Sequence, residues 1–190
     1  MIREYLFDYC EGLKKALDSV SPEKFEELMR LFESAYHDER QIFLMGNGGS
    51  GGTASHLACD FNKGVSFGLQ KRFRVICLND NMSTLTAYAN DVSYDEVFVE
   101  PLKNFLRPGD LVIGISGSGN SPNVLRAIEY AKRLGCVTIG ACGFEGGKLK
   151  SLVDHCFHVK VDDMQFVEDV HMIMVHVLMR ILDAGKQGSC

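Results

Sequence analysis

The spacing of apolar residues changes near residue 38 and divides the chain into two parts. Through residues 1–38, apolar side chains recur every three or four positions, which is the spacing of helices with one buried face. Within this part, Ser21 followed by Pro22 combines a capping residue with a proline at the first helical position, as is typical of a helix start. The first 38 residues are therefore predicted to form two helices.

Beyond residue 38, short apolar runs alternate with helical patterns. The apolar runs are rich in β-branched and aromatic residues and are interpreted as strands over 41–45, 74–78, 111–115, 137–141 and 156–161. Helical spacing separates them over 53–63, 82–105 and 122–134. This alternation predicts an α/β fold, in which a five-stranded parallel sheet is covered by helices on both faces.

A long apolar helix is predicted from Gln165 to about Ala184. It is apolar on most sides, a pattern typical of a helix buried in the fold or in an oligomer interface. No repeat, low-complexity tract or linker interrupts the chain. We therefore expect a single domain over 1–190, with a helical extension at 1–38, an αβα core at 39–184 and a loose tail at 185–190.

Composition argues against several classes of protein. Of the 190 residues, 46% are hydrophobic and 24% charged, which is ordinary for a globular protein. A net charge of −5 without a basic block disfavours nucleic acid as a partner. No apolar run approaches the ~20 residues of a membrane span, and the N-terminus lacks a signal-peptide core. The seven scattered cysteines are interpreted as buried thiols in a reducing compartment, so a cytoplasmic protein is expected.

A glycine-rich segment follows the first predicted strand. Five of the eight residues from Gly46 to Thr53 are glycine, and a helix is predicted to follow them directly. The backbone N–H groups of such a loop, with the positive end of the helix dipole, bind anions such as phosphate. No lysine follows the last glycine and no acidic ribose partner is in place, which disfavours a nucleotide. A tight turn that binds nothing is the alternative.

A second segment of this kind follows the third predicted strand. Residues 116–123 read SGSGNSPN and lead into another predicted helix. The hydroxyls of Ser116, Ser118 and Ser121, with N–H groups at the helix start, can surround a phosphate with neutral donors, which suits an acidic protein. Ser121 or Asn120 alone could simply cap that helix. Two such segments at strand ends favour a phosphorylated ligand.

Acid/base and metal-binding candidates lie on two predicted helices. His56 and Asp60 are four residues apart and so share one helix face. In the last helix, His171 lies roughly 60° and His176 roughly 80° around the axis from Glu168, and the two histidines are about 140° apart, so angle alone slightly favours His171 as its partner. Two imidazoles with two carboxylates suit Zn²⁺, although iron or manganese also uses them. A solvated ion pair and a core histidine are the alternatives.

Three motifs in this order resemble those of the sugar isomerase domain. They are GNGGS after the first strand, SxSGNSxN after the third and VEDVHMIMVH in the last helix, and together with the two N-terminal helices they are similar to the phosphoheptose isomerase branch. The resemblance covers nearly the whole chain. It implies a flavodoxin-like three-layer αβα fold, a homotetramer with sites between subunits, and isomerisation of sedoheptulose 7-phosphate or a related phosphorylated sugar.

The resemblance also assigns roles to individual residues. It implies a metal site formed by His56, Asp60, Glu168 and His176, with Asp60 as base and His176 as acid; here it is the resemblance that selects His176. The phosphate-binding hydroxyls would be those of Ser50, Ser116, Ser118 and Ser121, and the sugar-contacting positions fall on Asn81, Gly117 and Gln165. The glycine-rich segment adds Asn47, Gly48 and Gly49 as substrate-binding candidates, and Asp91 either orients substrate or caps a helix.

The chain departs from the family pattern at the sugar end of the site. Asp60 and Glu168 stand where glutamate and glutamine are usual, Gly117 where threonine is expected, and Asn81 and Gln165 where aspartates are expected. These differences keep a second hypothesis open, namely a non-catalytic module that senses a sugar phosphate or assists another protein, as replication-initiator-binding relatives do. The prediction is an isomerase, with this module as the alternative.

Overall fold

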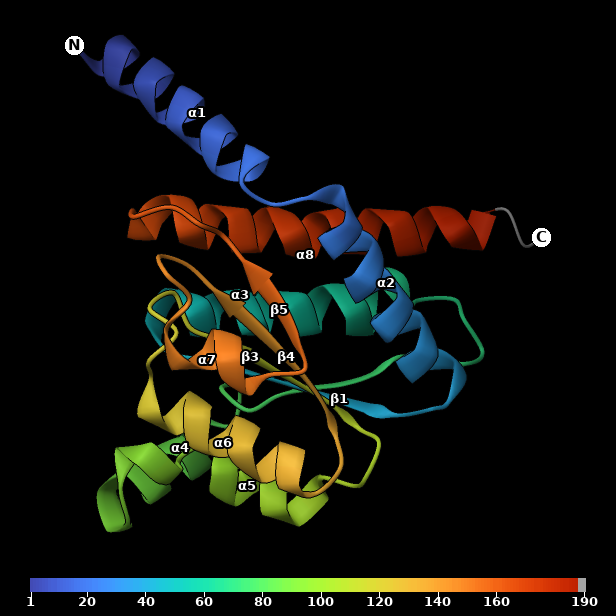
Figure 1. Cartoon of the computed structure of the whole chain (residues 1–190). Helices are drawn as coiled ribbons and strands as arrows, with labels where there is room; N and C mark the ends of the chain where they lie inside the picture. Colours follow the sequence, from blue (N-terminus) through green and yellow to red (C-terminus); the bar gives the residue numbers. More distant parts are fainter. Residues whose placement is uncertain (188–190) are drawn as a thin grey trace.

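Both N-terminal helices are present in the structure, a computed structural model that describes residues 1–187. They are α1 (Ile2–Asp18) and α2 (Pro22–His37). Ser21 precedes α2 with an extended backbone and Pro22 is its first residue, as predicted, because proline fixes a helical φ and lacks only an N–H that would have no partner there. In Figure 1, α1 projects away from the rest of the molecule.

The predicted five-stranded parallel sheet is confirmed. Its strands are β1 (Gln41–Gly46), β2 (Arg74–Cys77), β3 (Leu111–Ile115), β4 (Val137–Cys142) and β5 (His155–His158). Their order in space is β2-β1-β3-β4-β5, and every neighbouring pair is parallel. The last strand is shorter than the predicted 156–161, because the Val161 N–H turns back to the carbonyl of Val159 and the chain leaves the sheet.

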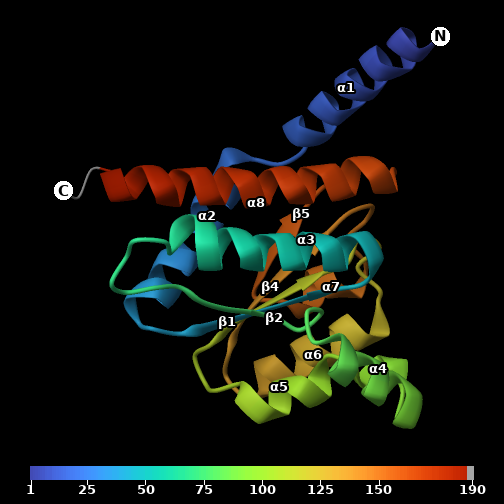
Figure 2. The same cartoon turned by 180° about the vertical axis from the view of Figure 1, so that it is seen from behind.

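Helices cover both faces of the sheet and give the expected three layers (Figures 1 and 2). One face carries α2, α3 (Gly48–Cys59), the π-helical turn η1 (Asp60–Val65) and α8 (Met164–Gln187), with the end of α1 packed against α8. The other carries α5 (Val99–Phe105), α6 (Pro122–Arg133) and α7 (Gly147–Leu152). Alternate strand residues enter the two cores: Leu44 faces α3, and Phe43 faces α5 and α6.

The helical pattern predicted over 82–105 is confirmed, but it is divided among three elements. They are α4 (Met82–Asp91), the short 3-10 turn η2 (Tyr94–Glu96) and α5. The Ser93 hydroxyl accepts a hydrogen bond from the Asp95 N–H, so this serine starts a new turn instead of continuing α4. At the other end of the chain, α8 continues to Gln187 into the predicted tail, of which 188–190 lie outside the described residues.

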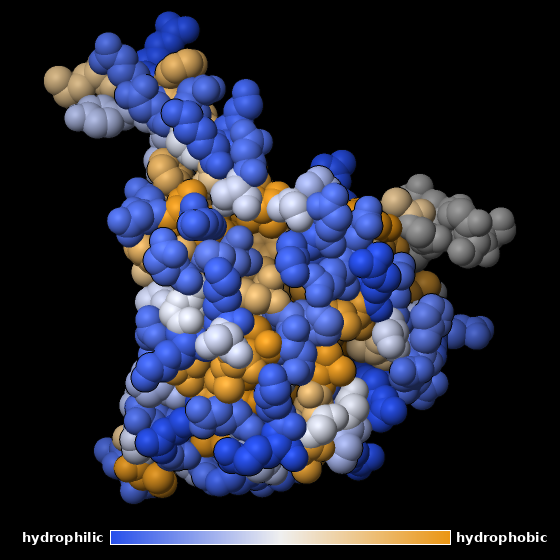
Figure 3. Space-filling model, in the orientation of Figure 1, coloured by the Kyte–Doolittle hydropathy of each residue, from blue (hydrophilic) through white to orange (hydrophobic). Residues whose placement is uncertain are grey.

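The surface differs from expectation at two cysteines and carries one apolar groove. Cys10 and Cys59 are exposed, so only some of the thiols are buried as predicted, and Cys190 lies outside the described residues. Figure 3 shows apolar side chains among hydrophilic ones on the face with α2 and α8. The groove there is lined mainly by apolar side chains of Leu17, Val20, Pro22, Phe25, Met29, Ile173, Val177 and Ile181. Within residues 1–187 no helix is both long and apolar enough to span a membrane.

Candidate active site

The two predicted phosphate-binding segments lie side by side at one edge of the sheet. They follow β1 and β3, which are neighbours and run in the same direction, and Gly46 at the end of β1 pairs with Ile115 at the end of β3. The strand order reverses between β1 and β3, and open α/β sheets bind their ligands in the crevice outside such a point. The topology therefore brings both segments to the position where a ligand is expected.

The segment after β1 is mostly helix rather than loop. Helix α3 begins at Gly48, five residues before the predicted start, and the glycines allow close packing. A Cβ added to Gly46 would lie 2.7 Å from the Ser50 carbonyl carbon, and one on Gly51 would lie 2.9 Å from the Gly46 oxygen. The first intrahelical bond is donated by the Gly51 N–H to the Asn47 oxygen. The preceding N–H groups, of Gly48, Gly49 and Ser50, are thus available to an anion.

The segment after β3 presents hydroxyls as predicted. The hydroxyl oxygens of Ser116 and Ser121 lie 3.0 Å apart, and Ser116 is buried. Ser121 is the residue that precedes α6, but its side chain makes no capping hydrogen bond and turns toward Ser116 instead. Ser118 is exposed and accepts a hydrogen bond from the Asn120 N–H. The arrangement favours the ligand interpretation of Ser121 over a simple helix cap.

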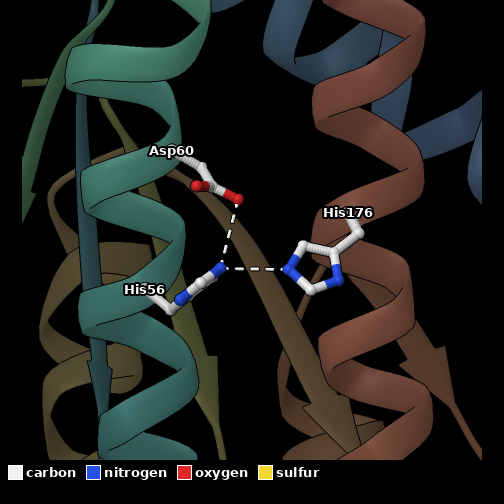
Figure 4. Close-up of side chains that lie close together, drawn as sticks. All are labelled: His56, Asp60 and His176. Carbon is white, nitrogen blue, oxygen red and sulfur yellow. Dashed lines mark hydrogen bonds and ion pairs between the residues drawn. The ribbon is translucent and has the colours of Figure 1, made fainter.

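The acid/base candidates meet between α3 and α8 (Figure 4). His56 Nε2 lies 3.0 Å from His176 Nε2 and 3.3 Å from Asp60 Oδ2. The two imidazole rings are nearly perpendicular, at 76°. Asp60 Oδ2 is buried and has no hydrogen-bond partner within residues 1–187. Both histidines are exposed. The three side chains form the group in the described part of the chain that could hold a metal ion, since their ligand atoms all lie within 4.8 Å of one another.

His171, which angle alone slightly favoured, lies away from this group. It is fully buried, and its Nε2 lies 3.4 Å from the Cys142 oxygen at the end of β4. Burial lowers the pKa of His171 to about 4, because the charged imidazolium would lose its hydration there. His171 is therefore a neutral core residue and His176 is the α8 histidine that faces α3. The angular argument failed because it took Glu168 as its reference, and Glu168 is not part of the group.

Glu168 lies at the start of α3 rather than beside His176. A Cβ added to Gly49 would be 2.5 Å from Glu168 Oε1, so the carboxylate rests directly against that glycine. The positive end of the α3 dipole favours a carboxylate there. Glu168 and His176 are eight residues apart, about 12 Å along the axis of α8. The described structure of the single chain thus brings together three of the four predicted metal ligands.

Comparison with known proteins shows the family to which the chain belongs. The SIS domain model matches residues 7–143. The chain belongs to the SIS domain family. It is 35% identical to a probable phosphoheptose isomerase from Thermoplasma acidophilum over 92% of this chain and 96% of that protein. It is 36% identical to a phosphoheptose isomerase from Helicobacter pylori over 94% and 92%. The structure of phosphoheptose isomerase from Neisseria gonorrhoeae superposes with a TM-score of 0.88 at 25% identity, covering 97% of this chain and 100% of that one.

Among the sugar-contacting candidates of this SIS domain, Gly117 lies within the segment after β3, and the others lie at the ends of α4 and on α8. Asn81 is exposed and caps α4 by accepting the Thr84 N–H, and Asp91 ends α4 and accepts from the Asn90 side chain. Gln165 is exposed in the first turn of α8. A Cβ added to Gly117 would lie 2.5 Å from the Met164 sulfur, so threonine would fit there only if the Met164 side chain moved. Among residues 1–184, no side-chain hydrogen bond joins Asn81, Asp91 or Gln165 to the segment after β1 or to the segment after β3.

Two residues that contact Asn47 were not predicted to belong to the site. The Asn123 carboxamide exchanges two hydrogen bonds, both 2.9 Å, with that of Asn47 and so ties the two segments together. The Tyr94 hydroxyl donates to Asn47 Oδ1 at 3.0 Å. Asn123 stood inside the quoted motif without a role. Tyr94 gave no signal, because it lies 47 residues from Asn47 and inside a segment for which only a helical pattern was predicted.

Proposed function

We propose that this protein is an aldose–ketose isomerase that acts on a phosphorylated sugar, sedoheptulose 7-phosphate or a close relative. The observation that carries the proposal is that α3 begins with uncapped N–H groups and presents His56 and Asp60 further along. Gly49 and His56 are seven residues apart, about 10 Å along the axis. An extended seven-carbon sugar phosphate has a comparable length. Its phosphate can lie at the helix start while its reactive carbons lie beside the histidines.

The phosphate would be bound by neutral donors from both segments, the one after β1 and the one after β3. The N–H groups of Gly48, Gly49 and Ser50 supply one side, and the hydroxyls of Ser116, Ser118 and Ser121 supply the other. Backbone donors at a helix start cost little to organise and favour an anion through the helix dipole. Such a site binds phosphate without a lysine or arginine and is consistent with the acidic composition of the chain.

The proton transfers would be carried out by Asp60 and His176. Isomerisation of a 2-ketose removes a proton from C1, forms an enediolate and returns the proton to C2, while a second group moves protons between O1 and O2. Asp60 is suited to remove the proton from carbon because its Oδ2, apart from the ion pair with His56, has no hydrogen-bond partner among residues 1–184 and can accept a proton. The exposed His176 imidazole can both donate and accept at the oxygens.

A divalent metal, Zn²⁺ for preference, fits the three side chains His56, Asp60 and His176. The spacings of 3.0 and 3.3 Å between their ligand atoms are near the roughly 3.3 Å that separates two ligands of a tetrahedral zinc ion with bonds of ~2.0–2.1 Å. The buried Oδ2 of Asp60, which has no hydrogen-bond partner within residues 1–187, also suits a cation. A bound ion would polarise the carbonyl oxygen of the sugar. Because a carboxylate that binds a cation is a weaker base, Asp60 would fill one role at a time.

The protein is further proposed to assemble as a homotetramer in the cytoplasm. The apolar groove between α2 and α8, and the exposed side chains of Tyr5, Leu6 and Phe7 on α1, support association with further copies of the chain. The cytoplasmic location rests on the composition alone. Glu168 remains a proposed fourth metal ligand, which in this arrangement would have to leave Gly49 or come from a neighbouring subunit.

The proposal is tested by incubating chelator-free protein with sedoheptulose 7-phosphate and following the formation of an aldose heptose phosphate. Turnover is expected. Binding of the sugar phosphate without turnover would instead support the non-catalytic module. Metal analysis of the same protein is expected to find zinc. If it finds no transition metal, and added Zn²⁺ does not raise the activity, the metal is removed from the proposal and the isomerase remains.

A further inference from the structure

Asn47 stands at the capping position of α3 but does not cap the helix. Its backbone is extended, as a capping residue requires, and asparagine is among the best capping residues because its side-chain oxygen accepts the N–H two or three residues later. Here no such bond forms. The N–H groups of Gly49 and Ser50, which that oxygen would normally satisfy, are left without it.

The Asn47 carboxamide is instead held by partners on two other elements. Its Nδ2 donates to Asn123 Oδ1, and its Oδ1 accepts from Asn123 Nδ2 and from the Tyr94 hydroxyl, at 2.9, 2.9 and 3.0 Å. Asn123 is almost fully buried in the first turn of α6. The Tyr94 turn is fixed to α6 by Arg126, which forms ion pairs with Asp95 and Glu96.

The direction of these hydrogen bonds is determined by one backbone donor. The Val124 N–H can only donate, and it lies 2.9 Å from Asn123 Oδ1. Asn123 must therefore present its NH₂ group to Asn47 Oδ1, and Asn47 must present its own NH₂ group to Asn123 Oδ1. Asn47 Oδ1 then accepts the Tyr94 proton. These hydrogen bonds, which link α6, Asn47 and Tyr94, direct the Asn47 Oδ1 acceptor away from the first turn of α3.

We propose that Asn123 and Tyr94 are positioning residues that hold the Asn47 carboxamide off the first turn of α3 and so keep its N–H groups free for the substrate phosphate. The inference rests on the proposed function, because it concerns the phosphate end of that site. Without these partners, the Asn47 side chain rotates onto the Gly49 or Ser50 N–H and caps α3, as asparagine does at most helix starts. The cap and the phosphate then compete for the same donors.

The decisive experiment compares Asn123→Ala with the double variant Asn47→Ala, Asn123→Ala. The dissociation constant of inorganic phosphate is measured by titration calorimetry, since this probe reports the phosphate end alone. Asn123→Ala is expected to weaken phosphate binding about fivefold, the typical strength of an asparagine cap. Asn47 is one of the predicted substrate-binding residues, but its side chain is engaged by Asn123 and Tyr94, and the proposed phosphate donors are backbone N–H groups and serine hydroxyls. Removal of the Asn47 side chain in that background is therefore expected to restore phosphate binding to within about twofold of the natural protein, because no side chain is left to form the cap.

A double variant that binds phosphate as weakly as Asn123→Ala, or more weakly, overturns the proposal, since Asn47 would then be needed for binding rather than held away from it. Steady-state kinetics provide a second readout: Asn123→Ala should raise KM with kcat unchanged, whereas general damage to the fold would lower kcat. If the natural protein binds neither phosphate nor sugar phosphate, the proposed function fails instead. Thermal melts confirm that each variant is folded.

The tyrosine has a matched control on the same segment. Tyr94→Phe removes the hydroxyl that donates to Asn47 and should raise KM about twofold, because Asn123 still holds the carboxamide. Tyr88→Phe removes a hydroxyl that has no hydrogen-bond partner among residues 1–187 and should leave KM unchanged. Equal KM values for both variants would show that Tyr94 does not help to hold the Asn47 carboxamide. A crystal structure of Asn123→Ala should show Asn47 Oδ1 within hydrogen-bonding distance of the Gly49 or Ser50 nitrogen.

Discussion

The two ends of α3 are built in opposite ways. At its start, the donors are neutral backbone N–H groups and serine hydroxyls, of which Ser50 and Ser116 are buried, and hydrogen bonds join the segments that carry them. At its end, the chemistry depends on ionisable side chains from two helices, two of them exposed, with a buried Asp60 oxygen that lacks a hydrogen-bond partner within residues 1–187. A neutral, rigid end is suited to binding, and an ionisable, incompletely satisfied end is suited to proton transfer.

The contrast is tested most strongly by removing the charge of Asp60. Asp60→Asn keeps the size of the side chain but removes the proposed base, so kcat should fall about 10²- to 10⁴-fold with KM changed little. Steady-state kinetics with sedoheptulose 7-phosphate measure both constants. Asp162→Asn, at an exposed position outside the group, is the matched control and should behave as the natural protein does. A kcat within threefold of the natural value for Asp60→Asn would remove Asp60 from the chemistry.

Helix α8 carries a buried histidine, His171, in addition to the exposed His176, and the buried one is expected to make the protein sensitive to acid. The folded-state pKa of His171 is about 4, below the ordinary value near 6.5, so between these values the unfolded chain binds a proton that the folded chain does not. The free energy of unfolding should therefore fall as the pH drops from about 6.5 to 4, with a loss on the order of 3 kcal/mol from this residue.

Denaturant unfolding at several pH values measures this loss. His171→Gln cannot titrate and should flatten the dependence, although its stability near pH 7 is expected to be lower because it changes a fully buried side chain. His37→Gln, at an exposed position, should keep the natural slope. An unchanged slope in His171→Gln would mean that the acid sensitivity arises elsewhere in the protein.

The same contrast explains which features the sequence could predict. Strand positions and the order of elements follow from periodicity, and serine and glycine segments after β1 and β3 are visible as local motifs, so the sheet and the place of both segments at neighbouring strand ends were predicted. The start of α3 was placed too late because glycine disfavours helices, whereas here Gly46, Gly49 and Gly51 satisfy packing contacts with partners distant in sequence or across a turn. At the start of α3, tertiary packing outweighs the low helix propensity of glycine.

The proton-transfer end was harder to predict because it depends on how two helices face each other. The spacing of Glu168, His171 and His176 gives their relative angles, but which histidine is buried depends on which side of α8 faces the sheet, and a helix with apolar residues on most sides does not reveal this. The role of Tyr94 is likewise a long-range contact to Asn47. Local motifs and the family resemblance indicated most residues of the candidate site, whereas tertiary structure determined their grouping and added Asn123 and Tyr94.

The smallest expected effect is at the hydroxyls of the phosphate end. Ser116→Ala removes a buried hydroxyl that pairs with Ser121, and loss of one neutral hydrogen bond to the phosphate should raise KM about two- to tenfold with kcat unchanged. Ser118→Ala should have an effect in the lower part of that range, because this hydroxyl is exposed and competes with water. Ser83→Ala, exposed on α4, is the control. A fall in kcat at constant KM in Ser116→Ala would contradict the assignment of binding to the start of α3 and of proton transfer to its end. It would mean that a neutral group at the start takes part in the proton transfer.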